Sequence, residues 1–148
     1  MKDGQFEKLV DDAIAIVEAN CADARARSDS IGILSYLRDF RTVRIDLGRG
    51  VGKTKYVRDH AERDDVIIVP TIGLRDHGYR DFRQAPCAAR VFPVIDLDRA
   101  RGLHPKRIFI DEGRMVDEAL RKQPGFGDMG YLYHLFGRST DQMFIIFA

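Results

Sequence analysis

A glycine-rich stretch directly after a short apolar run is the feature that most constrains the fold of this chain. The stretch occupies residues 47–54 and reads Leu47, Gly48, Arg49, Gly50, Val51, Gly52, Lys53 and Thr54. The run that leads into it, Val43, Arg44, Ile45, Asp46 and Leu47, is typical of a short strand, and the lysine and threonine are typical of a helix start. A strand, a glycine turn and a helix in this order predict a loop whose backbone N–H groups surround a phosphate.

The residues of this loop would have distinct tasks in nucleotide binding. The glycines leave the backbone uncovered, Lys53 can reach the β and γ phosphates, and the Thr54 hydroxyl can coordinate Mg²⁺. Residues 48–54 are therefore the expected nucleotide-binding residues. Leu47 departs from the usual pattern, G-x-x-x-x-G-K-[ST], which has glycine at that position. A glycine-rich connection that binds nothing would have the same composition. This stretch alone therefore does not distinguish a phosphate-binding loop from a structural connection.

A second element is a pair of acidic residues after another apolar run. Residues 107–110 follow Pro105 and predict a short buried strand, and Asp111 and Glu112 come directly after it. Ligands of open α/β sheets bind at the carboxyl ends of the strands. Asp111 can hold Mg²⁺ through its water shell, and Glu112 can orient or deprotonate the water that attacks the γ phosphate. An acidic pair also caps helices, here one expected to begin near Arg114 or Met115. Together with the glycine loop, the pair favours nucleotide binding.

The two motifs together resemble the ATPase domain of large terminase subunits, the DNA-packaging motors of tailed phages. More broadly they are similar to the additional-strand, catalytic-glutamate P-loop ATPases, which include helicases. Terminases often replace the first loop glycine and carry an arginine within the loop, as Leu47 and Arg49 do here. The resemblance covers about residues 40–148 and is specific at the two motifs.

The resemblance implies a three-layer P-loop NTPase fold of the α/β class, with a mostly parallel sheet and helices on both faces. Strands that alternate with helices along the chain predict the same class. ATP and Mg²⁺ are the implied cofactors, with Lys53 and Thr54 binding phosphate and Mg²⁺, Asp111 serving the metal and Glu112 as the catalytic carboxylate. A final strand at residues 143–147 is expected to insert between the loop strand and the acidic strand.

An arginine finger is a further expected part of such a site. Arg49 could serve in cis from within the loop, whereas Arg75, Arg80 or Arg83 could serve in trans from a second subunit. The arginine-rich middle of the chain can bind phosphate, but it can also pair with neighbouring acids, as Arg75 can with Asp76.

Two departures from the terminase pattern concern the end of the chain. The coupling motif of that family would begin just beyond the strand at 143–147, and a nuclease domain has no room in 148 residues. We therefore expect a stripped ATPase, a fragment, or one subunit of a split machine.

Length and composition describe one soluble domain, 1–148, with a helical segment at 1–40 and a nucleotide-binding core at 41–148. Hydrophobic residues make up 45% and charged residues 32%, which argues against disorder. The net charge of +1 gives no overall attraction to nucleic acid or membrane. No apolar run approaches a membrane span, and no signal sequence is evident. Cys21 and Cys87 are expected to be free thiols in a reducing cytoplasm, that of the host if the protein is viral.

The remaining pattern predicts a series of short elements. An amphipathic helix is expected at 5–20, with Phe6 in the core, then a polar turn or loose helix end at 23–30. The next elements are a helix at 31–40, capped by Ser28, Asp29 or Ser30, and a loop helix at 53–63. The second half of the chain predicts a strand at 66–69, helical or irregular structure at 76–83, an edge strand at 91–95, a helical turn at 96–101, a helix at 115–122 and a short helix within 126–140.

The sequence supports three hypotheses for function. The first is a Mg²⁺-dependent motor-type ATPase that acts on nucleic acid, with double-stranded DNA as the expected partner and a homo-oligomer or larger motor as the expected assembly. The second is a small nucleotide or metabolite kinase whose lid is the arginine-rich segment, although a water-activating Glu112 would have no task there. The third is a non-catalytic, degenerate P-loop module, which Leu47 and the absent coupling motif favour.

Overall fold

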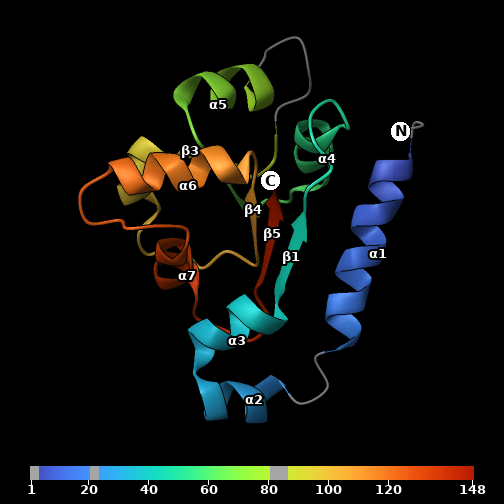
Figure 1. Ribbon diagram of the computed structural model, residues 1–148, viewed down its shortest axis with the longest axis vertical. Coiled ribbons are helices and arrows are strands. Elements are labelled where there is room, and N and C mark those ends of the chain that lie inside the picture. Colours follow the sequence, from blue (N-terminus) through green and yellow to red (C-terminus); the bar gives the residue numbers. More distant parts are fainter. Residues whose placement is uncertain (1–3, 21–23, 81–86) are drawn as a thin grey trace.

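The computed structural model describes residues 4–20, 24–80 and 87–148 and shows an α/β protein with a five-stranded, all-parallel sheet (Figure 1). Helices cover both faces of the sheet, so the expected three-layer α/β class is confirmed. The strands are β1 (Thr42–Ile45), β2 (Val66–Val69), β3 (Arg90–Pro93), β4 (Arg107–Ile110) and β5 (Met143–Phe147).

The strand order is β1-β5-β4-β2-β3, which places the last strand of the chain in the middle of the sheet. In the register, Ile145 of β5 faces Val43 of β1 on one side and Phe109 of β4 on the other. The predicted insertion of the final strand between the loop strand and the acidic strand is thus confirmed. β3 lies at the sheet edge, as Pro93 predicts, because a proline cannot donate to a neighbouring strand.

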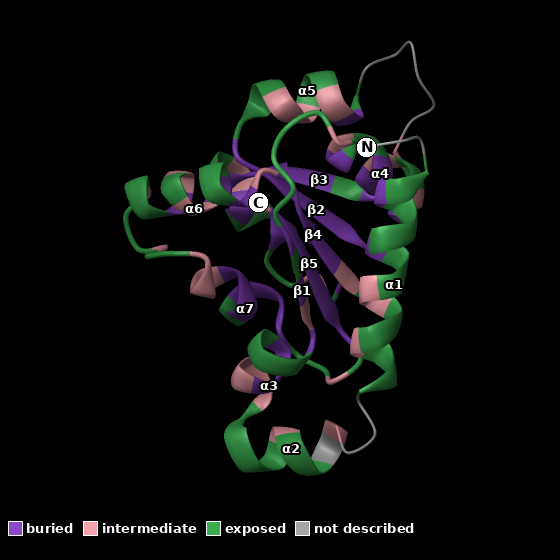
Figure 2. Ribbon diagram, turned by 45° about the vertical axis from the view of Figure 1, so that its right-hand side comes forward, coloured by how far each residue is buried: buried purple, intermediate pink, exposed green. Residues whose placement is uncertain are grey.

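The helices divide into two layers (Figures 1 and 2). One face of the sheet is covered by α1 (Gln5–Ala19), α4 (Lys53–His60) and α5 (Ile72–Tyr79). The other face is covered by α3 (Ile33–Phe40), the 3₁₀ helix η1 (Val94–Ala100), α6 (Gly113–Lys122) and α7 (Gly130–Phe136). The short helix α2 (Ala24–Ile31) lies at the end of the molecule opposite α5 (Figure 1).

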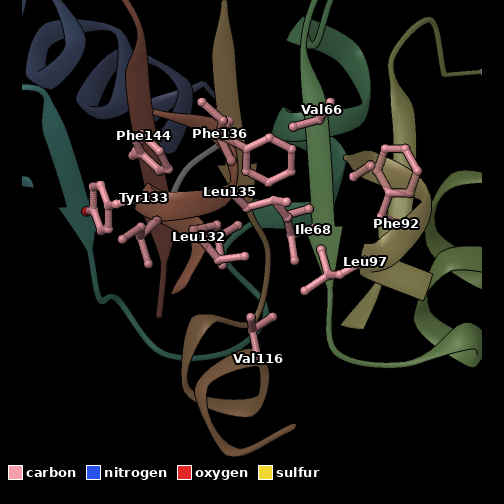
Figure 3. Close-up of a cluster of buried hydrophobic side chains, with 14 of the residues drawn as sticks. Val66, Ile68, Phe92, Leu97, Val116, Leu132, Tyr133, Leu135, Phe136 and Phe144 are labelled. Atoms are coloured by element: carbon pink, nitrogen blue, oxygen red, sulfur yellow. The ribbon is translucent and has the colours of Figure 1, made fainter. Parts of the chain in front are cut away.

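Strand geometry sorts the core residues between these two layers. Successive side chains of a strand point to opposite faces, so Ile108 and Ile110 of β4 join the core under α6 and α7, whereas Phe109 joins the core under α1 and α4. Figure 3 shows the first of these cores, where Leu132 and Phe136 of α7 pack beside the sheet. Both faces are apolar, as expected for a parallel sheet covered on both sides.

The N-terminal helices belong to the same two cores and do not form a separate layer. Phe6 of α1 is 5% exposed and packs on one face, while Tyr36 and Leu37 of α3 are buried against the other. Among the described residues, no helix combines the length and apolarity that a membrane crossing requires.

Several predicted boundaries are wrong by part of a turn or more. The polar segment at 23–30 is helical from Ala24 and forms α2 rather than a turn. Gly32, with φ 87°, separates α2 from α3, so the expected caps at 28–30 lie inside a helix. α4 ends at His60, earlier than predicted, and α6 begins at Gly113, earlier than Met115.

The segment predicted as helical or irregular at 76–83 is helical through Tyr79, in a helix that begins earlier than predicted. α5 runs from Ile72 to Tyr79 because Thr71 caps it, its hydroxyl accepting a hydrogen bond from the backbone N–H of Leu74 at 3.1 Å. The end of the predicted range, 81–83, lies outside the described residues.

Candidate functional site

The glycine loop joins the carboxyl end of β1 to the first turn of α4. Gly48, Gly50 and Gly52 have φ angles of 75°, 74° and 96°, in the left-handed region that side chains disfavour. Leu47 is not among the residues with positive φ. Leucine at the first loop position therefore causes no backbone strain, whereas the three glycines are needed for the path of the loop.

Thr54 on α4 and Asp111 after β4 meet at the carboxyl edge of the sheet. The Thr54 hydroxyl donates to Asp111 Oδ2 at 2.6 Å. A second hydroxyl, that of Tyr79 at the end of α5, donates to the same oxygen at 2.7 Å. Burial and the adjacent Asp111 carboxylate both raise the pKa of Tyr79 above its ordinary value, so this phenol keeps its proton.

Asp111 is fully buried, yet its two oxygens have different surroundings. Oδ2 accepts both hydroxyl hydrogen bonds, whereas Oδ1 has no hydrogen-bond partner among the residues that the structure describes. Within the same residues no ion pair neutralises the carboxylate. A buried anion with one free oxygen beside a threonine hydroxyl is an oxygen donor set that suits a hydrated Mg²⁺. The residues present therefore fit the metal.

Lys53 brings a positive charge to the same edge. Its side chain is 6% exposed, and its ammonium group donates to the backbone oxygen of Ala148 at 2.9 Å. Nζ also lies 4.0 Å from Glu112 Oε1. An ammonium has three donors, so Lys53 retains the capacity to bind a phosphate oxygen.

Glu112 has an unusual backbone conformation. With φ 54° and ψ 55°, it is the single non-glycine residue with positive φ in the described part of the chain. This conformation costs about 1 to 2 kcal/mol for an L-residue. Although Glu112 occupies the N-cap position of α6, its side chain makes no capping hydrogen bond. The Asp111 side chain accepts its hydrogen bonds from Thr54 and Tyr79 and not from the backbone of α6. The structure therefore gives no support to the interpretation of the acidic pair as a helix cap.

The start of α6, directly after Glu112, packs closely against β5. A Cβ on Gly113 would lie 2.8 Å from the Ile146 side chain and 3.3 Å from the Phe147 carbonyl oxygen. The backbone of α6 therefore approaches β5 more closely than a side chain at position 113 would allow. Arg114 of the same turn pairs with Asp46 after β1, which ties α6 to the strand that leads into the loop.

A pocket of about 430 Å³ opens beside these residues. Its walls include the expected residues Arg49, Gly50, Gly52, Lys53, Thr54 and Glu112, together with Lys55, Pro70, Thr71, Leu74 and Met115. Pro70 and Thr71 follow β2 directly, so they reach this edge for the same topological reason as Asp111. Residues from three strand ends thus converge on one opening.

A second pocket, of about 510 Å³, lies on the α1 side of the same loop. It shares Gly50, Gly52 and Lys55 with the first pocket. The rest of its lining comes from Gly4, from Val51 of the loop, and from residues of α1 and α4. Tyr56 and His60 stack there with ring centroids 4.0 Å apart. Two openings therefore flank one glycine loop.

The candidate arginine fingers are placed differently. Arg49 lines the first pocket. The predicted pairing of Arg75 with Asp76 is present at 2.9 Å, and Arg75 also lies 3.5 Å from Asp96, so its guanidinium is committed to the protein. Arg80 is exposed directly after α5, and Arg83 lies outside the described residues.

Of the two cysteines, the structure describes Cys87 alone. Cys87 is a half-buried free thiol, and its pKa is raised by burial. Cys21 lies outside the described residues.

Sequence reasoning missed Tyr79, Thr71 and Pro70. The last two follow an apolar run and could have been found by the strand-end argument that identified Asp111. Tyr79 carries no such signal, because it reaches Asp111 from the far end of a helix whose boundaries were predicted wrongly.

Comparison of the chain with protein-family models, with curated proteins and with solved structures finds no match.

Proposed function

We propose that this protein is a Mg²⁺-dependent P-loop ATPase. The observation that carries the proposal is the hydrogen bond between Thr54 of the glycine-loop helix and Asp111 of the acidic strand, at the carboxyl edge of a parallel sheet. The two motifs are far apart in sequence, and each has a structural explanation when taken alone. Their contact, beside an open pocket, supports one shared ligand.

The residues of the site have different roles in the proposed binding of the nucleotide. Backbone N–H groups of the glycine loop would bind the phosphates, and Lys53 would add a positive charge. Thr54 and Asp111 would hold Mg²⁺, which when bound neutralises charge on the phosphates of the nucleotide. The second pocket, with the Tyr56–His60 stack, offers the adjoining space for the nucleoside.

Glu112 is the proposed base that aligns and deprotonates the attacking water. It lies at the rim of the pocket, is partly exposed and makes no capping hydrogen bond, so its carboxylate is available. Its backbone strain is of the kind that accumulates at functional sites. A kinase has no water to activate, so Glu112 in this position favours hydrolysis over phosphoryl transfer to a second substrate.

The position of β5 supports the motor branch of this class. A strand between the loop strand and the acidic strand is the arrangement implied by the resemblance to additional-strand ATPases. We further propose that the protein acts on double-stranded DNA in the cytoplasm, of the host if it is viral, as part of a homo-oligomer or larger motor. Arg49 in cis or Arg80 in trans would then supply the finger, since Arg75 is already paired.

The test is phosphate release from Mg·ATP by the wild type, Glu112→Gln and Lys53→Ala, with and without double- or single-stranded DNA. We expect Glu112→Gln to bind ATP with near-normal affinity and to turn over about 10²- to 10⁴-fold more slowly, because a general base is lost. Lys53→Ala should lose affinity.

Other outcomes would decide against the proposal. Equal turnover by the wild type and Glu112→Gln would refute the role of Glu112. Tight ATP binding without phosphate release under any condition would favour the non-catalytic module, and phosphate transfer to an added nucleotide without release would favour a kinase.

A further inference from the structure

The carboxyl-terminal end of α5 is packed against the helix that follows the glycine loop. A Cβ on Gly78 would lie 3.0 Å from Thr54 Cγ2, so the backbone of α5 approaches Thr54 closely. Arg58 of α4 donates to the Gly78 carbonyl oxygen at 3.3 Å. Tyr79, the next residue, is 3% exposed and reaches past α4 to Asp111. The end of α5 therefore contacts both halves of the proposed metal site.

The hydrogen bonds at Asp111 are arranged asymmetrically. Thr54 and Tyr79 both donate to Oδ2, at 2.6 and 2.7 Å, while Oδ1 has no partner among the described residues. A carboxylate held by a single bond to one oxygen can rotate about its Cβ–Cγ bond. Two donors that approach the same oxygen from two different helices restrict that rotation. The free oxygen is then held in a fixed place.

We propose that Tyr79 is a positioning residue for the metal site: its hydroxyl fixes the Asp111 carboxylate so that Oδ1 stays free to accept from metal-bound water. The inference rests on the proposed function. It adds a residue outside both motifs and makes α5 the element that orients the metal-binding carboxylate. The role is indirect, since Tyr79 itself contacts neither nucleotide nor metal.

The test is Tyr79→Phe, which removes one hydroxyl and keeps the buried ring. Binding of a fluorescent N-methylanthraniloyl-ADP is measured in EDTA and across a MgCl₂ titration. We expect unchanged affinity in EDTA and about a tenfold higher Mg²⁺ concentration for half-maximal tightening, in line with loss of a hydrogen bond to a charged group. Asp111→Asn provides the limit in which Mg²⁺ no longer tightens binding.

Tyr133→Phe is the matched control. Tyr133 is also a buried tyrosine, 4% exposed, but its hydroxyl lies 2.8 Å from Thr42 Oγ1 in the core of the opposite sheet face. Removal of the Tyr133 hydroxyl should lower the melting temperature about as much as Tyr79→Phe does, and it should leave the Mg²⁺ titration unchanged.

Two results would overturn the inference. One is a Tyr79→Phe variant with the wild-type Mg²⁺ dependence, and the other is equal loss of affinity in EDTA and in Mg²⁺, which indicates general loosening. Failure of the proposed function gives a different result, because the wild type itself would then show no Mg²⁺-dependent nucleotide binding.

Discussion

Asp65 and Asp111 are both buried aspartates, yet they lie at opposite ends of the sheet and have opposite surroundings. Asp65 precedes β2 and is 2% exposed, and both of its oxygens have partners. Oδ1 accepts from the Arg107 backbone N–H at 3.0 Å, and Oδ2 accepts from the Arg107 guanidinium at 2.7 Å and from the Glu62 N–H at 2.8 Å. Asp111 follows β4 and has two neutral donors on one oxygen, while its second oxygen has no partner in the part of the chain that the structure describes.

The difference separates a structural carboxylate from one suited to binding. At the amino edge, the charge of Asp65 is neutralised within the protein and joins the starts of β2 and β4. At the carboxyl edge, no ion pair within the described residues neutralises Asp111, which is consistent with the proposed Mg²⁺. Burial alone does not distinguish these roles; the number and charge of the hydrogen-bond donors do.

Removal of the Asp65 carboxylate should have the strongest consequence for stability. Asp65→Ala leaves the half-buried Arg107 guanidinium and two backbone N–H groups without their acceptor, so we expect a loss of about 3 to 5 kcal/mol. Denaturant unfolding measures this change in the free energy of unfolding. Asp64→Ala, at the exposed neighbour, should change the free energy of unfolding by less than about 0.5 kcal/mol. Equal effects of the two substitutions would show that the Asp65 network contributes little.

Relief of the backbone strain at Glu112 should have a smaller effect on stability, and of the opposite sign. Glu112→Gly should stabilise the protein by about 1 kcal/mol, because glycine adopts φ 54° without strain, while hydrolysis is lost. Glu112→Ala is the control, since it removes the carboxylate and keeps the strain. If thermal unfolding shows the two variants to be equally stable, the conformation at position 112 is not strained.

The strand-end argument predicted the convergence at the carboxyl edge, because the order of parallel strands brings Thr54 and Asp111 to one side. Pro93 likewise marked the edge strand from its missing N–H. The sequence did not reveal Tyr79, whose contact depends on the angle at which α5 crosses the sheet. It did not reveal the Asp65–Arg107 pair either, since an Asp before one strand and an Arg at the start of another have no fixed spacing. Arg107 belonged to an arginine-rich segment in which phosphate binding and ion pairing were both open.

The prediction of helix boundaries was also wrong where tertiary packing, and not the local sequence pattern, sets them. Polar residues at 24–31 have no strong apolar period, and α2 owes its place to packing beside α3 rather than to its own pattern.

The most direct measurement compares the stability of the wild type and Asp111→Asn with and without a non-hydrolysable ATP analogue and Mg²⁺. Without ligand, the variant should lie within about 1 kcal/mol of the wild type, since the charge removed has no ion-pair partner within residues 4–20, 24–80 and 87–148. At a ligand concentration of about 100 times the wild-type Kd, the wild type should gain about 2.7 kcal/mol and the variant far less. An equal gain by both proteins, or a gain by the wild type that is as large in EDTA as in Mg²⁺, would contradict a metal-binding role for Asp111.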